Sequence, residues 1–131
     1  MSADTIVGKA LDNVPKAVAS GVVDMGTGML LAIKTTESHP QAVVDMVSAA
    51  TKELFEGDMV VAIEDAFKKA RGEDSNEHYF REILVSSKNL IHYFGRLSSS
   101  ENCVVAVVTR VDANLGMVVA KAREITTSEA I

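Results

Sequence analysis

The sequence predicts an α+β domain in which helices alternate with groups of β-strands. The segment from Cys103 to Val111 is almost continuously apolar and β-branched, which is typical of a strand covered on both faces. After Asp112-Ala113-Asn114, apolar residues from Leu115 to Ile125 recur at helical spacing, with Asn114 as the expected N-cap. A second helical pattern runs from Pro40 to about Arg71. With the remaining segments, these observations predict the order helix, two strands, long helical region, three strands, helix.

The beginning of the chain predicts a helix followed by a hairpin. Residues Asp4 to Leu11 carry an apolar stripe at helical spacing, and Pro15 follows its end. Small and β-branched residues from Lys16 to Asp24 predict a strand, and Met29 to Lys34 predict its return. Because the Met25-Gly26-Thr27-Gly28 turn between them is rich in glycine, we expect a β-hairpin here.

The helical region from Pro40 to Arg71 is too long for one straight helix on this domain. Such a helix would measure about 48 Å at ~1.5 Å per residue, whereas a domain of this size has a radius of gyration of about 14 Å. Pro40 is expected in the first turn, with Ser38 or His39 as the cap. The apolar stripe changes side at Gly57-Asp58, where a glycine can end one helix and an aspartate can cap the next. The two stripes are Val43, Val47, Ala50 and Leu54, followed by Phe55, Met59, Ala62, Ala66 and Ala70. We expect either two helices or one helix with two separate apolar faces, and in both cases more apolar surface than one sheet face needs.

The segment between the long helical region and the last strand predicts the two remaining strands. Residues Tyr79 to Ser87 and Leu90 to Leu97 predict two strands around Lys88-Asn89. The tail from Thr126 to Ile131 is expected to fray. No internal repeat or linker is visible, so residues 1–131 are interpreted as a single domain.

Composition narrows the class of protein. The chain has 131 residues, enough for one folded domain with a single core. Its net charge of −5 argues against nucleic acid and anionic membrane surfaces as partners, because both attract basic patches. One cysteine cannot form an internal disulfide framework, and no signal peptide or membrane-spanning run is visible. We therefore expect a cytoplasmic domain with no nucleic-acid or membrane partner.

Three stretches make the chain resemble the Roadblock/dynein light-chain family. They are the first hairpin from Val18 to Leu31, the strand pair ending in Asn89-Leu90-Ile91-His92-Tyr93-Phe94, and the closing block from Val104 to Val118. Within that block, Asn114-Leu115-Gly116 is similar to the family's N-L-G signature. The resemblance covers roughly Asp4 to Ile125.

The resemblance implies a five-stranded antiparallel sheet with the long helical region on one face and the N- and C-terminal helices on the other. It also implies a homodimer joined through the long helix and the edge strand that follows it, with no catalytic motif and no cofactor. Family members are non-enzymatic subunits that dock on dynein intermediate chains, or scaffolds and regulators of small Ras-like GTPases. The longer middle helical region differs from the short eukaryotic type, which favours a prokaryotic relative over a dynein subunit.

Few residues suggest chemistry, and we assign no catalytic, cofactor-binding or metal-binding residue. Gly26-Thr27-Gly28 lacks the Gly-Lys-Ser/Thr ending of a P-loop and lies between strands, so a plain turn is favoured. His92 and Cys103 lie on neighbouring predicted strands. A metal site needs three or four clustered ligands, however, and a thiol within an apolar strand usually behaves as a small hydrophobe.

The helical region carries two further sets of candidate residues. Five carboxylates are expected to form a solvated face, or alternatively to bind a basic partner: Glu53, Glu56, Asp58, Glu64 and Asp65. Met46, Met59 and Phe67 are expected in the core rather than in a dimer seam.

We therefore predict a homodimeric interaction module that performs no chemistry and binds a small GTPase or another switch NTPase. Pairing of the edge strand from Phe80 to Ser87 with its two-fold mate would satisfy the free backbone groups of that edge. The self-association surface is predicted at Val43, Val47, Leu54, Phe80, Ile83 and Val85. One alternative is a small-molecule sensor of the profilin-like, PAS or GAF type, with Thr109 and His92 lining a pocket. A further alternative is an enzyme that uses Cys103 and His92.

Overall fold

The structure is a computed structural model that describes residues 2–36, 41–72, 78 and 80–131, with only the backbone described for residues 41–46. The elements are α1 (Ala3–Asn13), β1 (Ala17–Asp24), β2 (Met29–Thr35), α2 (Gln41–Glu56), α3 (Asp58–Arg71), β3 (Glu82–Ser86), β4 (Leu90–Leu97), β5 (Ser100–Arg110) and α4 (Leu115–Ser128). The predicted order is confirmed, with the long helical region divided into α2 and α3. The expected caps Ser38 and His39, Pro40 itself and Tyr79 lie outside the described residues.

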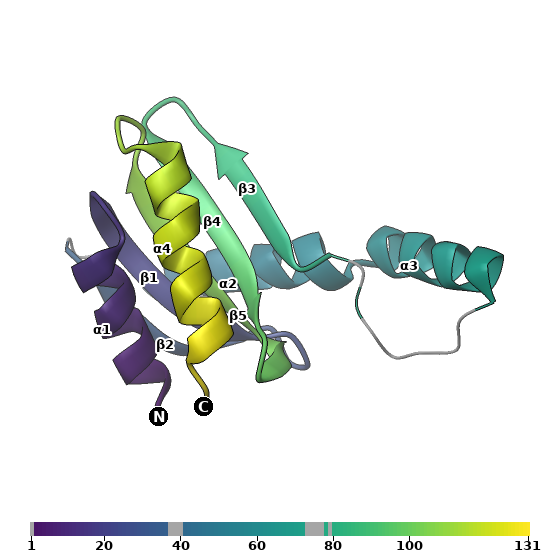
Figure 1. The fold of residues 1–131 in the computed structure, drawn as a ribbon. Helices are drawn as coiled ribbons and strands as arrows, with labels where there is room; N and C mark the ends of the chain where they lie inside the picture. The colour runs from purple at the N-terminus through teal and green to yellow at the C-terminus, as the bar shows by residue number, and fades with distance from the viewer. Residues whose placement is uncertain (1, 37–40, 73–77, 79) are drawn as a thin grey trace.

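The strands form one antiparallel sheet in the order β2-β1-β5-β4-β3, which confirms the predicted fold class (Figure 1). The strand β5, predicted to be covered on both faces, lies at the centre between β1 and β4. Its two alternating sets of side chains face opposite sides of the sheet. Cys103, Val105 and Val107 belong to one core cluster, and Val104 belongs to the other.

The terminal helices α1 and α4 pack side by side on one face of the sheet (Figure 1). Ser2 caps α1 through Thr5, and Asn114 caps α4 through the backbone N–H of Met117, as its sequence predicts. The larger core forms beneath these helices. It joins Ile6 of α1 and Val118 of α4 to Tyr93 and Val105 of the sheet.

The helix α2 covers the other face with a smaller core. Phe55 is fully buried there and packs with Val23, Phe94 and Val104, while Leu30 and Ile83 contribute partly buried side chains. The helical region breaks at Gly57, which is the N-cap of α3 in an extended conformation. Figure 1 shows α3 projecting past the outer edge of β3, away from the sheet. None of the described helices is long and apolar enough to cross a lipid bilayer.

The C-terminal tail corrects one expectation, because it is ordered rather than frayed. The helix α4 continues to Ser128, and Thr126 and Glu129 are buried. The Thr126 carbonyl accepts a hydrogen bond from the backbone N–H of Ser98, and the Glu129 carboxylate pairs with Lys9 of α1. These partners are distant in sequence, so the local composition of the tail could not reveal them.

Candidate self-association surface

The two outer strands of the sheet differ in how well they could pair with another strand. The strand β2 carries a β-bulge opposite Val22 and Val23, where the pairing skips Leu31. Bulges of this kind protect sheet edges, because they disturb the row of free backbone groups. The strand β3 pairs with β4 in unbroken register from Glu82 to Ser86, and its outer edge has no partner strand within the described chain. We therefore identify β3 as the edge suited to pairing.

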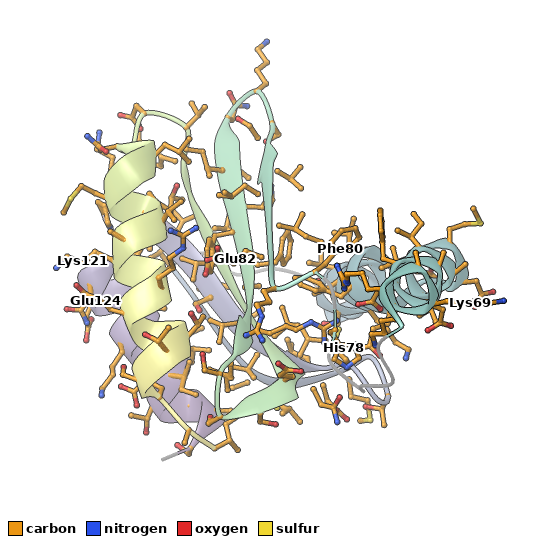
Figure 2. The ribbon with its side chains drawn as sticks, turned by 45° about the vertical axis from the view of Figure 1, so that its right-hand side comes forward. Lys69, His78, Phe80, Glu82, Lys121 and Glu124 are labelled. Atoms are coloured by element: carbon orange, nitrogen blue, oxygen red, sulfur yellow. The ribbon has the colours of Figure 1, made fainter. Side chains whose placement is uncertain are left out.

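The interface residues predicted on the edge segment lie on or beside β3 as expected. Val85 is 40% exposed, whereas Ile83 and Phe80 are partly buried against the core beneath α2. Phe80 precedes the strand, since β3 is shorter than the predicted Tyr79–Ser87 segment. Figure 2 shows Phe80 on the side of the molecule occupied by α2 and α3, with Glu82 nearer the middle of the sheet.

Two of the predicted interface residues on α2 point outward. Val47 and Leu54 are exposed, while the helix uses Ser48, Thr51 and Phe55 as its buried side. The side chains of Val43 and of Met46 lie outside the described residues. Phe55, predicted in one stripe with Met59, instead lies in the core, because the helix breaks two residues later.

The helix α3 exposes its apolar residues and buries a carboxylate. Met59, Ile63 and Phe67 are 75%, 42% and 46% exposed, whereas Glu64 is 3% exposed. At about 100° per residue these three side chains share one stripe with Ala62, Ala66 and Ala70. We call these six residues the α3 stripe. The expectation that Met59 and Phe67 lie in the core is wrong, and so is the expectation that Glu64 belongs to a solvated face.

A buried arginine fixes the point at which α3 leaves the sheet. Arg96 of β4 is 5% exposed, and its guanidinium lies 5.0 Å from the centre of the Phe55 ring. It donates hydrogen bonds to the Phe80 carbonyl at 2.8 Å and to the Glu101 carbonyl at 2.7 Å, and it pairs with the Glu56 carboxylate at 3.1 Å. One side chain therefore joins the end of α2, the segment before β3 and the β4–β5 hairpin. Sequence reasoning missed this residue, because a lone arginine in a strand carries no local signal.

A second polar cluster attaches the edge strand to α4. The Glu82 carboxylate accepts hydrogen bonds from Arg123 at 2.7 to 3.0 Å and from the buried Tyr93 hydroxyl at 2.6 Å. The Arg123 guanidinium holds the pKa of Glu82 below its ordinary value. Burial, together with the hydrogen bond to Glu82, raises the pKa of Tyr93. The cluster keeps β3 in position next to α4, and none of the described strands pairs with its outer edge.

Solved structures share this arrangement of sheet and helices. A structure described as MglB with tetrameric arrangement superposes with a TM-score of 0.69 at 18% identity, over 96% of this chain and 83% of that chain. Gliding protein MglB from Thermus thermophilus gives 0.68 at 19% identity, over 95% and 82% of the two chains. A Roadblock/LC7 domain from Streptomyces avermitilis gives 0.67 at 12% identity, over 96% and 92%. The chain has the Roadblock/LC7 fold. No protein-family model and no curated protein matches the sequence.

The residues considered for chemistry lie apart in this Roadblock/LC7 fold. Cys103 is buried in the core beneath α1 and α4. His92 pairs in register with Val108, near the other end of β5, and its ring stacks on Phe94 of the opposite core. The two side chains therefore face opposite sides of the sheet. The described residues contain no group of three or more potential metal ligands.

The glycine-bearing turn of the Roadblock/LC7 hairpin is closed by its own side chains. Asp24 accepts hydrogen bonds from the Thr27 hydroxyl at 2.9 Å and from the Gly26 N–H at 3.2 Å. Gly28 has a φ of 74°, a conformation that favours glycine. The turn is thus a hairpin connection between β1 and β2, as predicted from its position between two strands.

Proposed function

We propose that the chain is a non-enzymatic, homodimeric regulatory module that binds a small Ras-like GTPase. The observation that carries the proposal is the α3 stripe, an apolar surface that its own sheet does not cover. A contiguous group of exposed apolar side chains is typical of a protein–protein contact site. The unbulged edge of β3 supplies the second half of the argument, because antiparallel pairing with a two-fold mate would satisfy its backbone groups.

The fold supports the regulatory part of this proposal. The resemblance to the Roadblock family implies scaffolds and regulators of Ras-like GTPases, and the similar solved structures include a gliding protein, MglB, and one MglB with a tetrameric arrangement. A two-fold dimer of this chain would present two copies of each surface side by side. Such a platform can bind the switch regions of a GTPase, which change conformation with the γ-phosphate.

Self-association is tested by placing a charge on the β3 edge. In Val85→Asp, two like charges would lie close to the two-fold axis, so the dimer dissociation constant should rise at least tenfold. The control is Met29→Asp, because Met29 is also exposed, 64% against 40% for Val85, and lies on the other outer strand, β2. Light scattering at micromolar concentration measures the oligomeric state of the wild type and of both variants. A wild-type monomer, or a Val85→Asp variant that stays dimeric like the control, would contradict the proposed edge pairing.

The GTPase partner is tested by calorimetric titration with bacterial Ras-like GTPases. Each GTPase is loaded with GDP or with a non-hydrolysable GTP analogue. Binding to one nucleotide state at least tenfold more tightly than to the other is expected, since a regulator must distinguish the two. The chain alone should hydrolyse no GTP. Equal affinity for both states would contradict a regulatory role.

The alternative function, a small-molecule sensor, is less well supported than the regulatory module, because its two candidate pocket residues do not lie together. Thr109 is fully buried, and its hydroxyl donates to the Arg110 carbonyl at 3.1 Å. His92 faces the opposite side of the sheet from the larger core. A pocket would require several polar groups that converge on one point, and these two do not.

A further inference from the structure

The helical region is interrupted at a single residue, Gly57, which separates α2 from α3 (Figure 1). Its φ of −63° is helical, but its ψ is 158°, so α3 is rotated about that bond by about 160° relative to a continuous helix. Helical hydrogen bonds remain on both sides. The Gly57 N–H donates to the Glu53 carbonyl at 2.9 Å, and the Val61 N–H donates to the Gly57 carbonyl at 3.0 Å. The break therefore consists of one backbone torsion.

The sequence on the two sides of Gly57 nevertheless keeps the spacing of one continuous helix. The buried side of α2 includes Thr51 and Phe55. Helical steps of three and four residues from Phe55 reach four members of the α3 stripe: Met59, Ala62, Ala66 and Ala70. In the structure this pattern is interrupted, because Phe55 is fully buried whereas Met59 is 75% exposed. The apolar pattern thus matches a straight helix, although the structure is bent.

The bent form has stabilising features of its own. A Cβ at Gly57 would lie 2.6 Å from the Glu53 carbonyl oxygen, so this form accepts only glycine. Asp58 lies in the first turn of α3, where a negative charge is favourable at a helix N-terminus. The Phe55 carbonyl, at the end of α2, accepts a hydrogen bond from the Arg96 guanidinium at 3.5 Å.

A continuous helix would have a different advantage. Gly57 makes no side-chain hydrogen bond to the first turn of α3. In a continuous helix the N–H groups of residues 58–60 would instead donate to the carbonyls of residues 54–56. The Arg96 contact would remain possible, because a carbonyl oxygen has two lone pairs. Glycine disfavours the interior of a helix, however, so each form has one advantage and one cost.

We propose that Gly57 is a hinge at which the helical region interconverts between the bent form and one continuous helix from Gln41 to Arg71. The hinge lies within one chain, so it does not depend on the homodimer proposed above. In the bent form the α3 stripe is exposed as described. In the continuous helix four of its members share the side of α2 that carries Phe55. The hinge therefore sets the direction in which this apolar surface is presented.

The fixed parts of the chain are compatible with both forms. Arg96 lies 3.1 Å from the Glu56 carboxylate and 2.8 Å from the Phe80 carbonyl, so the two ends of the moving segment are held together. In a continuous helix Arg71 would lie about 22 Å from Glu56 at ~1.5 Å per residue. The chain from Arg71 to Phe80 can extend to about 30 Å, which is enough to return to Arg96.

Substitutions at two neighbouring positions should select opposite forms. Gly57→Ala introduces the Cβ that the bent form cannot accommodate, and alanine favours a helix interior. Asp58→Pro favours the bent form, because proline suits the first position of a helix after an extended residue but disrupts a helix interior. Gly8→Ala in α1 is the matched control, since a Cβ at Gly8 would meet nothing within 4 Å.

Amide hydrogen exchange, followed by NMR, distinguishes the two forms at Met59 and Val60. Their N–H groups would donate to carbonyls of α2 only in the continuous helix, so exchange should be about tenfold slower in Gly57→Ala than in Asp58→Pro. The rates of the wild type and of Gly8→Ala should lie between these values. A wild-type rate equal to that of either hinge variant would show that only one form exists, which would overturn the hinge.

Distances between spin labels give a second measurement. Labels at Ala50→Cys in α2 and Lys69→Cys in α3, in a chain that also carries Cys103→Ala, would lie about 29 Å apart along a continuous helix. Dilution with unlabelled chain restricts the measurement to distances within one chain. Pulsed electron paramagnetic resonance should give this distance in Gly57→Ala, a different distance in Asp58→Pro, and both in the wild type. A single distance in the wild type would overturn the hinge, whether the protein is a monomer or a dimer.

Discussion

At the scale of single residues, Arg96 does the most to organise the candidate surface. It is the only described arginine side chain that is almost fully buried, and its partners belong to three separate segments. A buried charge is costly unless it is paired and hydrogen-bonded, and here its partners supply three acceptors and an aromatic face. The position of α3 relative to the sheet therefore depends on this residue.

Replacing Arg96 should destabilise the fold strongly. For Arg96→Ala we expect the free energy of unfolding to fall by about 3 kcal/mol, because the Glu56 carboxylate and two carbonyls lose their donor. Arg96→Lys should recover only part of this loss, since one ammonium group cannot reproduce the planar guanidinium fork. Chemical denaturation measures both variants.

Arg110→Ala is the matched control for Arg96. Arg110 is on the next strand, its side chain is 68% exposed, and it lies 3.5 Å from Asp112. Exposed pairs of this kind contribute about 0 to 1 kcal/mol. Equal losses for the two arginine variants would show that Arg96 is not the fixed point described above.

At the scale of elements, the sequence predicted which segments form the sheet but not how their ends are held. Leu90–Leu97 was predicted with its exact bounds, because its apolar run is continuous and its turns are clear. The start of β3 was predicted too early, since the Phe80 carbonyl is bound by the Arg96 side chain. The ordered tail was missed because Glu129 pairs with a lysine 120 positions away.

In the helical region, too, the position of the elements was predictable but their contacts were not. The change of stripe at Gly57 was readable from spacing alone, and the structure places the break there. A Cβ at Gly57 would lie 2.6 Å from the Glu53 carbonyl, so this conformation of the break requires glycine. The exposure of the α3 stripe could not be predicted, because periodicity reports that a face is apolar but not which surface covers it.

The attachment of β3 to α4 should depend on pH through Glu82. Its pKa is lowered from the ordinary value of 4.5, chiefly by the hydrogen bonds from Arg123. A depressed pKa in the folded state contributes stability above the ordinary value, and this contribution is lost as the pH falls through the folded value. The difference in unfolding free energy between wild type and Glu82→Gln should therefore be constant near neutral pH and shrink below about pH 4.5.

Denaturant titrations from pH 7 to pH 3 measure this difference. Lys121 and Glu124 on the same helix form a solvent-exposed pair at 3.8 Å, so Glu124→Gln serves as the control and should show a much smaller difference. A difference for Glu82→Gln that is unchanged at pH 3 would mean that the carboxylate is not held by Arg123 in solution.

At the scale of the whole molecule, α3 projects past β3, so the α3 stripe and the outer edge of β3 lie on the same side of the structure (Figure 1). The α3 stripe is exposed, and the outer edge of β3 has no partner strand within the described part of the chain. In the proposed homodimer, a two-fold mate paired through β3 would lie beside both surfaces. Stability should then be a property of the dimer, because association favours the folded state by mass action. The midpoint of thermal unfolding should rise with protein concentration in the wild type and in Met29→Asp, and it should be independent of concentration in Val85→Asp. Scanning calorimetry over a hundredfold range of concentration measures this dependence. A wild-type midpoint that does not move with concentration would show that each subunit covers its apolar surfaces alone.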